Sequence, residues 1–359
     1  MVMFIDFVMS RFGISKITRD IQKINFIIKK ILPKDNPEIS IKRLKNLFLS
    51  FIAWRYGFFL GDIKPIILQV ETVSGCNFNC IMCRAGSLKK EFMTYDEFEK
   101  ILYKIPEAFV IIMNLAGEPF LSKDTLKLIR YASLERKAIV NIFSNFSVLP
   151  DPYEVLNSGL YEIHASIDTF DPIKFSKIRE GGKLEKVISN LETLIETRKK
   201  IKKSLPIISI NAVCSEETIE DTEDIILNAI KIGVDRVKFQ RLLFDIPELH
   251  RPSQKSQQYL LYLKKKYKDK IDVILNNFEN IGDKSDGYCY LAYFMLAIKV
   301  NGDVYPCCMP YPNFFPFESI MGNIFASNNS WNKKRMEFVS NFRDSPPNFC
   351  QICPLYYRK

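Results

Sequence analysis

The sequence predicts an α/β fold built as a partial (β/α)6 barrel, a shorter relative of the TIM barrel. From Pro65 onward, short apolar runs alternate with amphipathic helical segments, and this pattern is typical of a parallel sheet covered by helices. One helix start has a capping box, Thr94 with Glu97, and residues 184–195 repeat apolar side chains at helical spacing. We interpret six apolar runs as strands: residues 66–71, 109–115, 138–143, 161–168, 206–213 and 234–240.

Polar side chains share one parity along these predicted strands. Because successive strand residues point to opposite faces, residues of one parity lie on one face. Aliphatic residues dominate the other parity and should pack under the helices, so the polar set should line the barrel lumen. His164, the deepest of the set, fits a hydrogen-bonded core residue better than a functional one. The set comprises Gln69, Glu71, Asn141, His164, Ser166, Asp168, Ser209, Asn211, Lys238 and Gln240.

Length and composition limit the possible functions. At 359 residues the chain exceeds one average domain, so we expect two or three domains. The net charge of +10 suits nucleic acid, an anionic membrane or an anionic substrate. No zinc-finger, homeodomain or aromatic RNA-binding motif accompanies the Lys residues, so no nucleic-acid partner is expected. Nine Cys, closely grouped in a chain without a recognisable secretory signal, indicate metal binding in a reducing, cytoplasmic compartment.

Residues 1–64 are rich in Phe, Ile and Lys and predict two helical pieces, 1–32 and 38–60. The second piece holds an apolar run, residues 47–60, that is too short to span a bilayer and contains Arg55. The basic residues Lys42, Arg43 and Lys45 precede this run. Two interpretations stay open: a helix lying at the membrane surface, or an amphipathic helix packed on its own domain.

Cys76, Cys80 and Cys83 form a C-x3-C-x2-C motif just after the first predicted strand. Three thiolates on one tight loop can hold three irons of a cubane cluster and leave the fourth iron open to an exogenous ligand. The alternatives are a zinc knuckle or scattered core thiols, but zinc requires a fourth ligand at short spacing, and no neighbour is Cys or His. The motif resembles that of the radical S-adenosylmethionine (radical SAM) superfamily.

In that superfamily the amino and carboxylate groups of SAM chelate the open iron, and an electron from the cluster splits SAM to give a 5′-deoxyadenosyl radical. The resemblance therefore implies a 4Fe-4S cluster on the three Cys and SAM as a second cofactor. It also implies a reductant such as flavodoxin or ferredoxin as a partner, and the partial barrel that the strand pattern predicts.

The segment Gly117-Glu118-Pro119 follows the second predicted strand, where superfamily members usually have Gly-Gly-Glu-Pro. The resemblance implies that Glu118 accepts a hydrogen bond from the SAM ammonium. Ala116 replaces the first Gly, at little cost if the backbone φ there is negative. Arg179, in a stretch similar to the family's Ile-Arg-Gly, is implied to pair with the SAM carboxylate. The resemblance also suggests Met82, Ser144 and Asn145 as contacts of SAM. The strand pattern adds Ser166, Asp168 and Gln240 as lumen residues that could bind it.

The tail, residues 283–359, no longer alternates between strand and helix patterns. Residues 296–306 predict a hairpin that turns at Asn301-Gly302. Four Cys of the tail resemble the SPASM domain in its shortened twitch form, which holds one auxiliary 4Fe-4S cluster; they are Cys289, Cys307, Cys350 and Cys353. Four thiolates would close that cluster, so it should transfer electrons or orient substrate. The expected domains are a helical segment 1–64, a partial barrel 65–282 and a twitch/SPASM domain 283–359.

Cys308 follows the second auxiliary Cys directly. In related sulfatase-maturing enzymes an Asp at this position acts as a base, which suits net oxidation. A thiol can instead return a hydrogen atom to a carbon radical, which suits a redox-neutral epimerisation. Because Pro-Cys-Cys also occurs in SPASM tails of unrelated function, a catalytic Cys308 and a merely structural one both stay open. Cys214, in the fifth strand, is expected in the core.

The combined motifs predict an enzyme that abstracts hydrogen from an unactivated C–H bond. The basic amphipathic segment favours a membrane-associated lipid or lipid-linked glycan as substrate, and a protein located in the cytoplasm at the membrane surface. The first alternative is a maturase or epimerase that modifies a peptide, although residues 1–64 are too short and too helical for a leader-binding winged helix. The second alternative is a non-catalytic iron-sulfur electron carrier.

Overall fold

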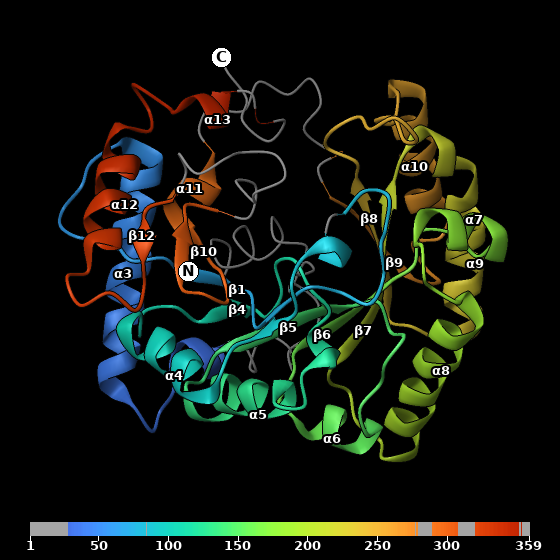
Figure 1. Cartoon of the computed structure of the whole chain (residues 1–359), viewed down its shortest axis with the longest axis horizontal. Helices are drawn as coiled ribbons and strands as arrows, with labels where there is room; N and C mark the ends of the chain where they lie inside the picture. Colours follow the sequence, from blue (N-terminus) through green and yellow to red (C-terminus); the bar gives the residue numbers. More distant parts are fainter. Residues whose placement is uncertain are drawn as a thin grey trace.

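The computed structural model describes residues 28–83, 85–276, 278, 289–307, 320–351 and 353. Within them, one sheet has ten strands in the order β12-β11-β10-β1-β4-β5-β6-β7-β8-β9, and it curves so that helices cover its outer side (Figure 1). The predicted α/β partial barrel and its six parallel strands are confirmed. These strands are β1 (Ile67–Val70), β4 (Val110–Ile112), β5 (Ile139–Ser144), β6 (Glu162–Ser166), β7 (Ile207–Cys214) and β8 (Arg236–Arg241).

Both edges of the sheet carry strands that the sequence did not predict as part of the barrel. At one edge, β9 (Asp272–Asn276) pairs in parallel with β8. At the other edge, β10 (Met295–Ile298) pairs in parallel with β1. The next strand, β11 (Asp303–Tyr305), pairs antiparallel with β10. The hairpin predicted at Asn301-Gly302 is therefore present, and it extends the barrel sheet. A short strand β12 (Gly322–Asn323) follows, and β2 (Val73–Ser74) with β3 (Glu91–Phe92) forms a separate ribbon.

The outer helices pack on the aliphatic parity of the strands. Val140 and Ile142 of β5 lie in one buried core with Leu191 and Leu194 of α8. The predicted capping box starts α4: the Glu97 backbone N–H donates to Thr94 Oγ1 at 3.3 Å. These helices are α4 (Tyr95–Lys104), α5 (Thr125–Arg130), α6 (Pro152–Asn157), α7 (Pro172–Ile178), α8 (Leu184–Lys200), α9 (Thr222–Ile232) and α10 (Gln254–Lys266).

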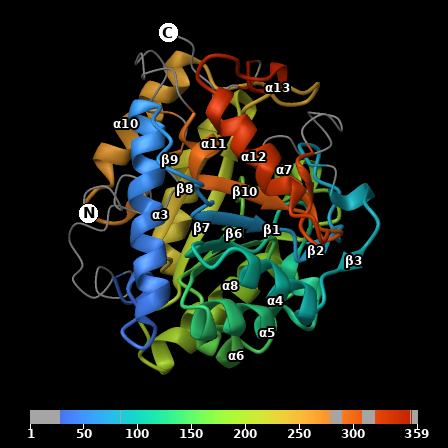
Figure 2. The same ribbon diagram turned by 90° about the vertical axis from the view of Figure 1, so that its left-hand side faces the viewer.

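A second core lies against the inner and entry sides of the sheet. It joins Leu47 and Ala53 of α3 (Pro37–Tyr56) to the strand residues Ile67, Val110 and Ile139. Figure 2 shows α3 as a long helix that runs along one side of the molecule. The tail contributes α11 (Tyr290–Phe294), α12 (Ser330–Asn341) and α13 (Asn348–Gln351).

Arg43 of α3 has a different role from the one its sequence neighbours indicate. The sequence places it among basic residues that flank a membrane-facing run, but the structure buries it. Its guanidinium donates to five backbone carbonyls, those of Lys30, Pro106, Ala108, Arg136 and Lys137. Four of these carbonyls directly precede β4 or β5. Arg43 therefore holds α3 against the amino-terminal ends of these two strands. A guanidinium can do this because it carries five donors in one plane.

The membrane question concerns the rest of the amino-terminal segment. Residues 1–27, which contain most of the first predicted helical piece, lie outside the described residues. Where the structure describes the chain, no helix has the length and apolar content that a bilayer crossing requires. Several large apolar side chains in and just after α3 nevertheless face solvent: Ile41, Phe48, Tyr56, Phe58 and Leu60.

Candidate functional site

The three Cys of the C-x3-C-x2-C motif lie on the loop after β1, and nitrogen donors already point at their sulfur atoms. Cys76 Sγ accepts from the Phe78 backbone N–H at 3.4 Å and from Asn145 Nδ2 at 3.5 Å. Cys83 Sγ accepts from the Ala85 backbone N–H at 3.4 Å. Such donors favour the thiolate over the thiol, and the thiolate is the form that binds metal.

Burial acts against the thiolate in the same loop. It raises the pKa of Cys80 to about 11, and it raises the pKa of Cys76 as well. A bound cation offsets that cost, because metal ligation deprotonates a thiol. Among the described residues, no three His, Cys, Asp or Glu side chains converge on one point as ligands of a single metal ion do. A cubane cluster requires Cys side chains that lie further apart than the ligands of a single metal ion, because each Cys binds a different iron.

The Cys loop is fastened to the end of α7. The Asn79 backbone N–H donates to the Glu180 carbonyl at 2.8 Å, and the Ile81 backbone N–H donates to the Ile178 carbonyl at 3.0 Å. Asn79 Nδ2 also donates to Glu180 Oε2 at 2.9 Å. The sequence offered no sign of this contact, because the partners lie about a hundred residues apart and two of the three bonds join backbone atoms.

The loop after β4 approaches the Cys loop at a glycine. The Gly75 N–H donates to the Ala116 carbonyl at 3.1 Å, and the Glu118 N–H donates to the Gly75 carbonyl at 3.2 Å. A Cβ on Gly117 would lie 2.0 Å from the Val73 carbonyl oxygen, so only Gly fits there. Ala116 is not among the residues with a positive φ, so its replacement of a family Gly introduces no backbone strain.

The Glu118 carboxylate is buried and joins the ends of β4 and β5. It accepts from Ser144 Oγ at 2.8 Å, the Asn145 N–H at 2.7 Å and the Phe120 N–H at 3.1 Å. Burial raises the pKa of Glu118 to about 7, although these donors work in the opposite direction. Three of the residues that the resemblance assigns to SAM, Glu118, Ser144 and Asn145, thus form one connected group beside Cys76.

Arg179 is paired within the protein. Its Nη2 donates to Asp168 Oδ1 at 3.0 Å, and its Nε lies 2.8 Å from Asp168 Oδ2. Its Nη1 reaches Cys80 Sγ at 4.0 Å. The Val213 N–H also donates to Asp168 Oδ1, at 2.8 Å. The sequence assigned Asp168 and Arg179 separately to SAM, and their buried ion pair was not foreseen.

The remaining predicted SAM residues lie around this centre. Met82 is half-buried on the Cys loop, and Ser166 and Gln240 are half-buried on inward-facing positions of β6 and β8. Ser166 is the register partner of Asn211, and Gln240 is the partner of Val213.

The auxiliary Cys gather at the tail. Cys289, Cys307 and Cys350 pack against the same inner core. Burial raises the pKa of Cys350, and the neighbouring Cys289 and Cys353 raise it further. Cys289, Cys350 and Cys353 therefore lie near one another, and Cys307 packs against the same core. Cys308 lies outside the described residues, and Cys214 is buried in the outer core as the sequence predicts.

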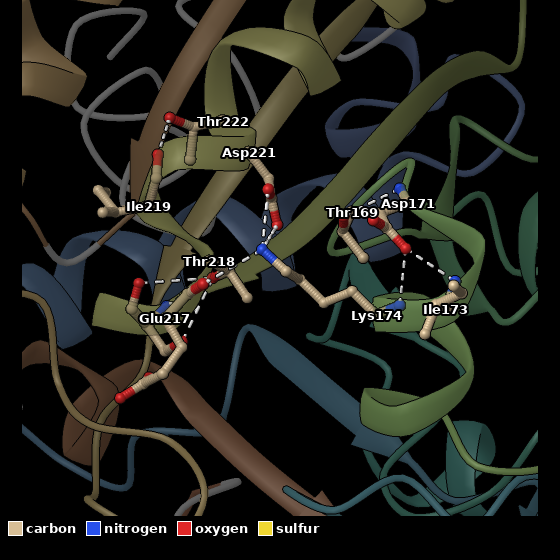
Figure 3. Close-up of polar contacts among 10 residues, drawn as sticks. Thr169, Asp171, Ile173, Lys174, Glu217, Thr218, Ile219, Asp221 and Thr222 are labelled. Carbon is tan, nitrogen blue, oxygen red and sulfur yellow. Dashed lines mark hydrogen bonds and ion pairs between the residues drawn. The ribbon is translucent and has the colours of Figure 1, made fainter.

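Ion pairs join the loops at the rim of the barrel, and Figure 3 shows the pair of Lys174 and Asp221. Lys174 of α7 contacts both carboxylate oxygens of Asp221, at 3.0 and 2.8 Å, and so joins α7 to the 3-10 helix η4 (Glu216–Asp221) (Figure 3). Glu217 of η4 contacts His250 Nδ1 at 2.7 Å in the loop after β8. The ends of β6, β7 and β8 are thereby held together around the site.

Comparisons with known proteins match two parts of the chain to known families. Residues 70–229 match the family model of the radical SAM superfamily, and residues 289–354 match the SPASM iron-sulfur cluster-binding domain. The chain belongs to the radical SAM superfamily and carries a carboxy-terminal SPASM domain. These family matches indicate an enzyme with 4Fe-4S clusters and S-adenosylmethionine as cofactors.

Sequence relatives cover part of the chain. A probable GTP 3′,8-cyclase of Methanocaldococcus jannaschii is 30% identical over 172 residues, which are 46% of this chain and 55% of that protein. A GTP 3′,8-cyclase of Clostridium botulinum strain Hall is 29% identical over 185 residues, 49% of this chain and 56% of that protein. The chain thus spans little more than half the length of these relatives.

Solved structures match a larger share of this chain. Streptococcus suis SuiB bound to S-adenosylmethionine has a TM-score of 0.65 at 15% identity, over 94% of this chain and 87% of that one. The structure of anSMEcpe with bound AdoMet has a TM-score of 0.57 at 19% identity, over 81% of this chain and 83% of that one. At such identity the likeness shows a shared fold.

Proposed function

We propose that this enzyme cleaves SAM reductively at a cluster held by Cys76, Cys80 and Cys83, and that the product radical abstracts hydrogen from an unactivated C–H bond of a substrate. The observation that carries the proposal is the set of nitrogen donors aimed at Cys76 and Cys83, next to the buried Glu118 group. One electron from a flavodoxin or ferredoxin would break the C5′–S bond of SAM. The cluster and SAM would thus supply the hydrogen-abstracting radical, with methionine and 5′-deoxyadenosine as the by-products.

The chain's own residues would orient SAM and protect the reaction. Glu118 supplies a carboxylate for the SAM ammonium, since each carboxylate oxygen can accept more than one hydrogen bond. Ser144 and Asn145 hold that carboxylate in place. Arg179, kept in position by Asp168, supplies positive charge beside Cys80. Met82 and Gln240 stay as expected contacts of SAM, and the four auxiliary Cys are proposed to hold a second cluster that transfers electrons or orients substrate.

The Glu118→Ala variant tests this arrangement. We expect SAM to bind at least about tenfold more weakly and 5′-deoxyadenosine formation to fall, because a charged hydrogen bond is worth about 1.5–3 kcal/mol. SAM affinity and 5′-deoxyadenosine would be measured on anaerobically reconstituted, dithionite-reduced protein, with iron content as the check on both clusters. Glu97→Ala, which removes the exposed carboxylate of the α4 capping box, is the matched control. Unchanged SAM affinity in Glu118→Ala would remove Glu118 from the SAM site.

The chemical class of the substrate is a separate proposal, with a peptide and a lipid as the two candidates. SuiB has also been solved bound to its precursor peptide SuiA, with a TM-score of 0.62 at 15% identity to this chain. That likeness supports the fold, so the peptide-modifying alternative remains a proposal, as does a catalytic Cys308. A lipid or lipid-linked glycan substrate depends on a membrane-surface role for α3.

For that role the structure offers exposed apolar and basic side chains on the outer side of α3. Phe48 is 62% exposed and Phe58, just beyond the helix, 67%, while Lys45 and Arg55 are exposed on the same helix. Apolar side chains beside cations are typical of segments that lie on anionic membranes.

Vesicle binding tests the membrane proposal. We expect full-length protein to sediment with anionic vesicles at low salt, and Phe48→Glu with Phe58→Glu to abolish this, because the charged side chains cannot enter the interface. Leu227→Glu, at a half-exposed Leu of α9, is the control. Substitutions are better than truncation, since removing α3 would also remove the carbonyl contacts of Arg43. Protein that ignores anionic vesicles would leave α3 as a cover of the barrel and the lipid substrate without support.

A further inference from the structure

Asn145, just after β5, donates from its side chain to a sulfur atom of the Cys loop. Its Nδ2 lies 3.5 Å from Cys76 Sγ, and the residue is only 5% exposed, so water competes little for this donor. Cys76 Sγ also accepts from the Phe78 N–H at 3.4 Å, but changing a side chain does not remove a backbone donor. Asn145 is therefore the residue through which the hydrogen bonding of this sulfur can be altered.

Contacts with Ser147 fix the orientation of the Asn145 amide. The Ser147 backbone N–H donates to Asn145 Oδ1 at 2.9 Å, and Ser147 Oγ donates to the same oxygen at 2.6 Å. A backbone N–H can only donate, so it must face the oxygen of the amide and not its nitrogen. A flipped amide would also turn an oxygen toward the sulfur. Nδ2 is therefore the atom that faces Cys76.

Asn77 closes a ring of three side chains around this amide. Asn145 Nδ2 donates to Asn77 Oδ1 at 2.9 Å, Asn77 Nδ2 donates to Ser147 Oγ at 2.8 Å, and Ser147 Oγ donates back to Asn145 Oδ1. Asn77 Oδ1 lies further from Cys76 Sγ, at 3.8 Å, and already accepts from the Asn145 amide. Because each member of the ring donates and accepts, the bonds strengthen one another and hold the donor in place.

These contacts use the full hydrogen-bonding capacity of the Asn145 amide. Its two N–H groups point to Cys76 and Asn77, and its oxygen accepts twice from Ser147. An amide has two donors and two acceptor positions, so all four are occupied. The side chain is thus committed to the sulfur and the ring, while the Asn145 backbone N–H separately holds the Glu118 carboxylate at 2.7 Å.

We propose that Asn145, by donating to Cys76 Sγ, raises the reduction potential of the cluster held by Cys76, Cys80 and Cys83, and that its side chain does not bind SAM. This inference rests on the proposed function, because it requires that cluster. Reduction adds negative charge, and a hydrogen bond to a ligand sulfur stabilises the more negative state. The donor therefore makes the cluster easier to reduce, and its removal should make reduction harder.

Potentiometric titration of reconstituted full-length protein without SAM, followed by electron paramagnetic resonance, tests the proposal. The signal to follow is the one that disappears when Cys76, Cys80 and Cys83 are replaced with Ala, and the signal of the auxiliary cluster is the internal reference. In Asn145→Leu we expect the equilibrium constant for reduction to fall at least threefold. That change is a shift of about 30 mV to lower potential, at about 59 mV per tenfold for one electron.

Asn190→Leu is the matched control. Asn190 of α8 is also a buried amide, and its Nδ2 donates to the Phe146 and Ser147 carbonyls at 2.7 and 3.3 Å. It supports the same loop through backbone carbonyls and from the side of α8, so its loss should leave the potential as in the parent. An equal shift in both variants would trace the effect to a displaced loop and overturn the inference.

Two other results would overturn it. One is an unchanged potential in Asn145→Leu, and the other is a loss of SAM affinity with an unchanged potential, which would assign the side chain to SAM. If Asn145→Leu does not bind its normal iron, Asn145→Asp keeps the acceptor for Ser147, replaces the donor with an oxygen and should also lower the potential. The proposed function fails separately: a cluster whose potential shifts in protein that forms no 5′-deoxyadenosine would keep this role of Asn145 and lose the radical reaction.

Discussion

Replacing Cys76, Cys80 and Cys83 together with Ala should remove about half of the bound iron and abolish 5′-deoxyadenosine formation. The reconstituted parent should hold about eight irons, since three Cys and four Cys each support one 4Fe-4S cluster, and the variant should keep about four. The auxiliary cluster should survive, because its ligands lie on the tail and pack against a different core from the Cys loop. Iron analysis and electron paramagnetic resonance of the reduced protein measure this directly.

Cys214→Ala is the control for this experiment. Cys214 is buried at the end of β7 and packs in the outer core, so its loss should change neither the iron content nor SAM cleavage. A folded triple variant that has lost all its iron, or a parent that holds only four irons, would contradict the assignment of the second cluster to the tail.

The barrel could be predicted because its strands alternate so regularly. Val140, Ile142 and Phe239 face the helices, while Asn141 and Lys238 face inward, and each of these placements follows from strand parity alone. The position of β10 beside β1 could not be predicted in the same way. Its own sequence predicts a hairpin, but the parallel pairing with β1 depends on an edge more than two hundred residues away.

Arg43 shows why composition misleads for a long basic side chain. Beside Lys42 and Lys45 it is indistinguishable from a solvated cation, and only the fold reveals the carbonyls that precede β4 and β5 around it. His164 provides the contrast. Its depth in the barrel predicted a core residue, and the structure agrees by stacking its ring on Phe143 with the centroids 4.1 Å apart.

The site was predicted as a set of residues and not as a network. The motifs identified Glu118, Ser144 and Asn145 one at a time, whereas the structure shows that two of them hold the third. Asp168 and Arg179 were likewise assigned to SAM one at a time, the first from its strand end and the second from the resemblance. Their ion pair could not be read from the sequence, since it depends on how α7 returns over the end of β6.

Removing one partner of that buried ion pair should lower stability strongly, and this gives the last prediction. Arg179→Leu leaves the buried Asp168 carboxylate without its cation, and removing one partner of a buried pair costs about 3–5 kcal/mol. Asp168→Leu should cost a similar amount by leaving the guanidinium uncompensated. The double Leu variant should be more stable than either single variant, because neither charge then remains buried.

Thermal unfolding of the three variants under anaerobic conditions measures the coupling. The exposed rim pair offers a contrast: Lys174→Ala breaks the contact with Asp221 in Figure 3, but Lys174 is 38% exposed, so the loss should be about 1 kcal/mol or less. SAM affinity separates the two roles of Arg179. If it pairs directly with the SAM carboxylate, the double variant would recover stability without recovering SAM binding. If the single and double variants unfold at the same temperature, the buried pair is not coupled and Arg179 is held in place by other contacts.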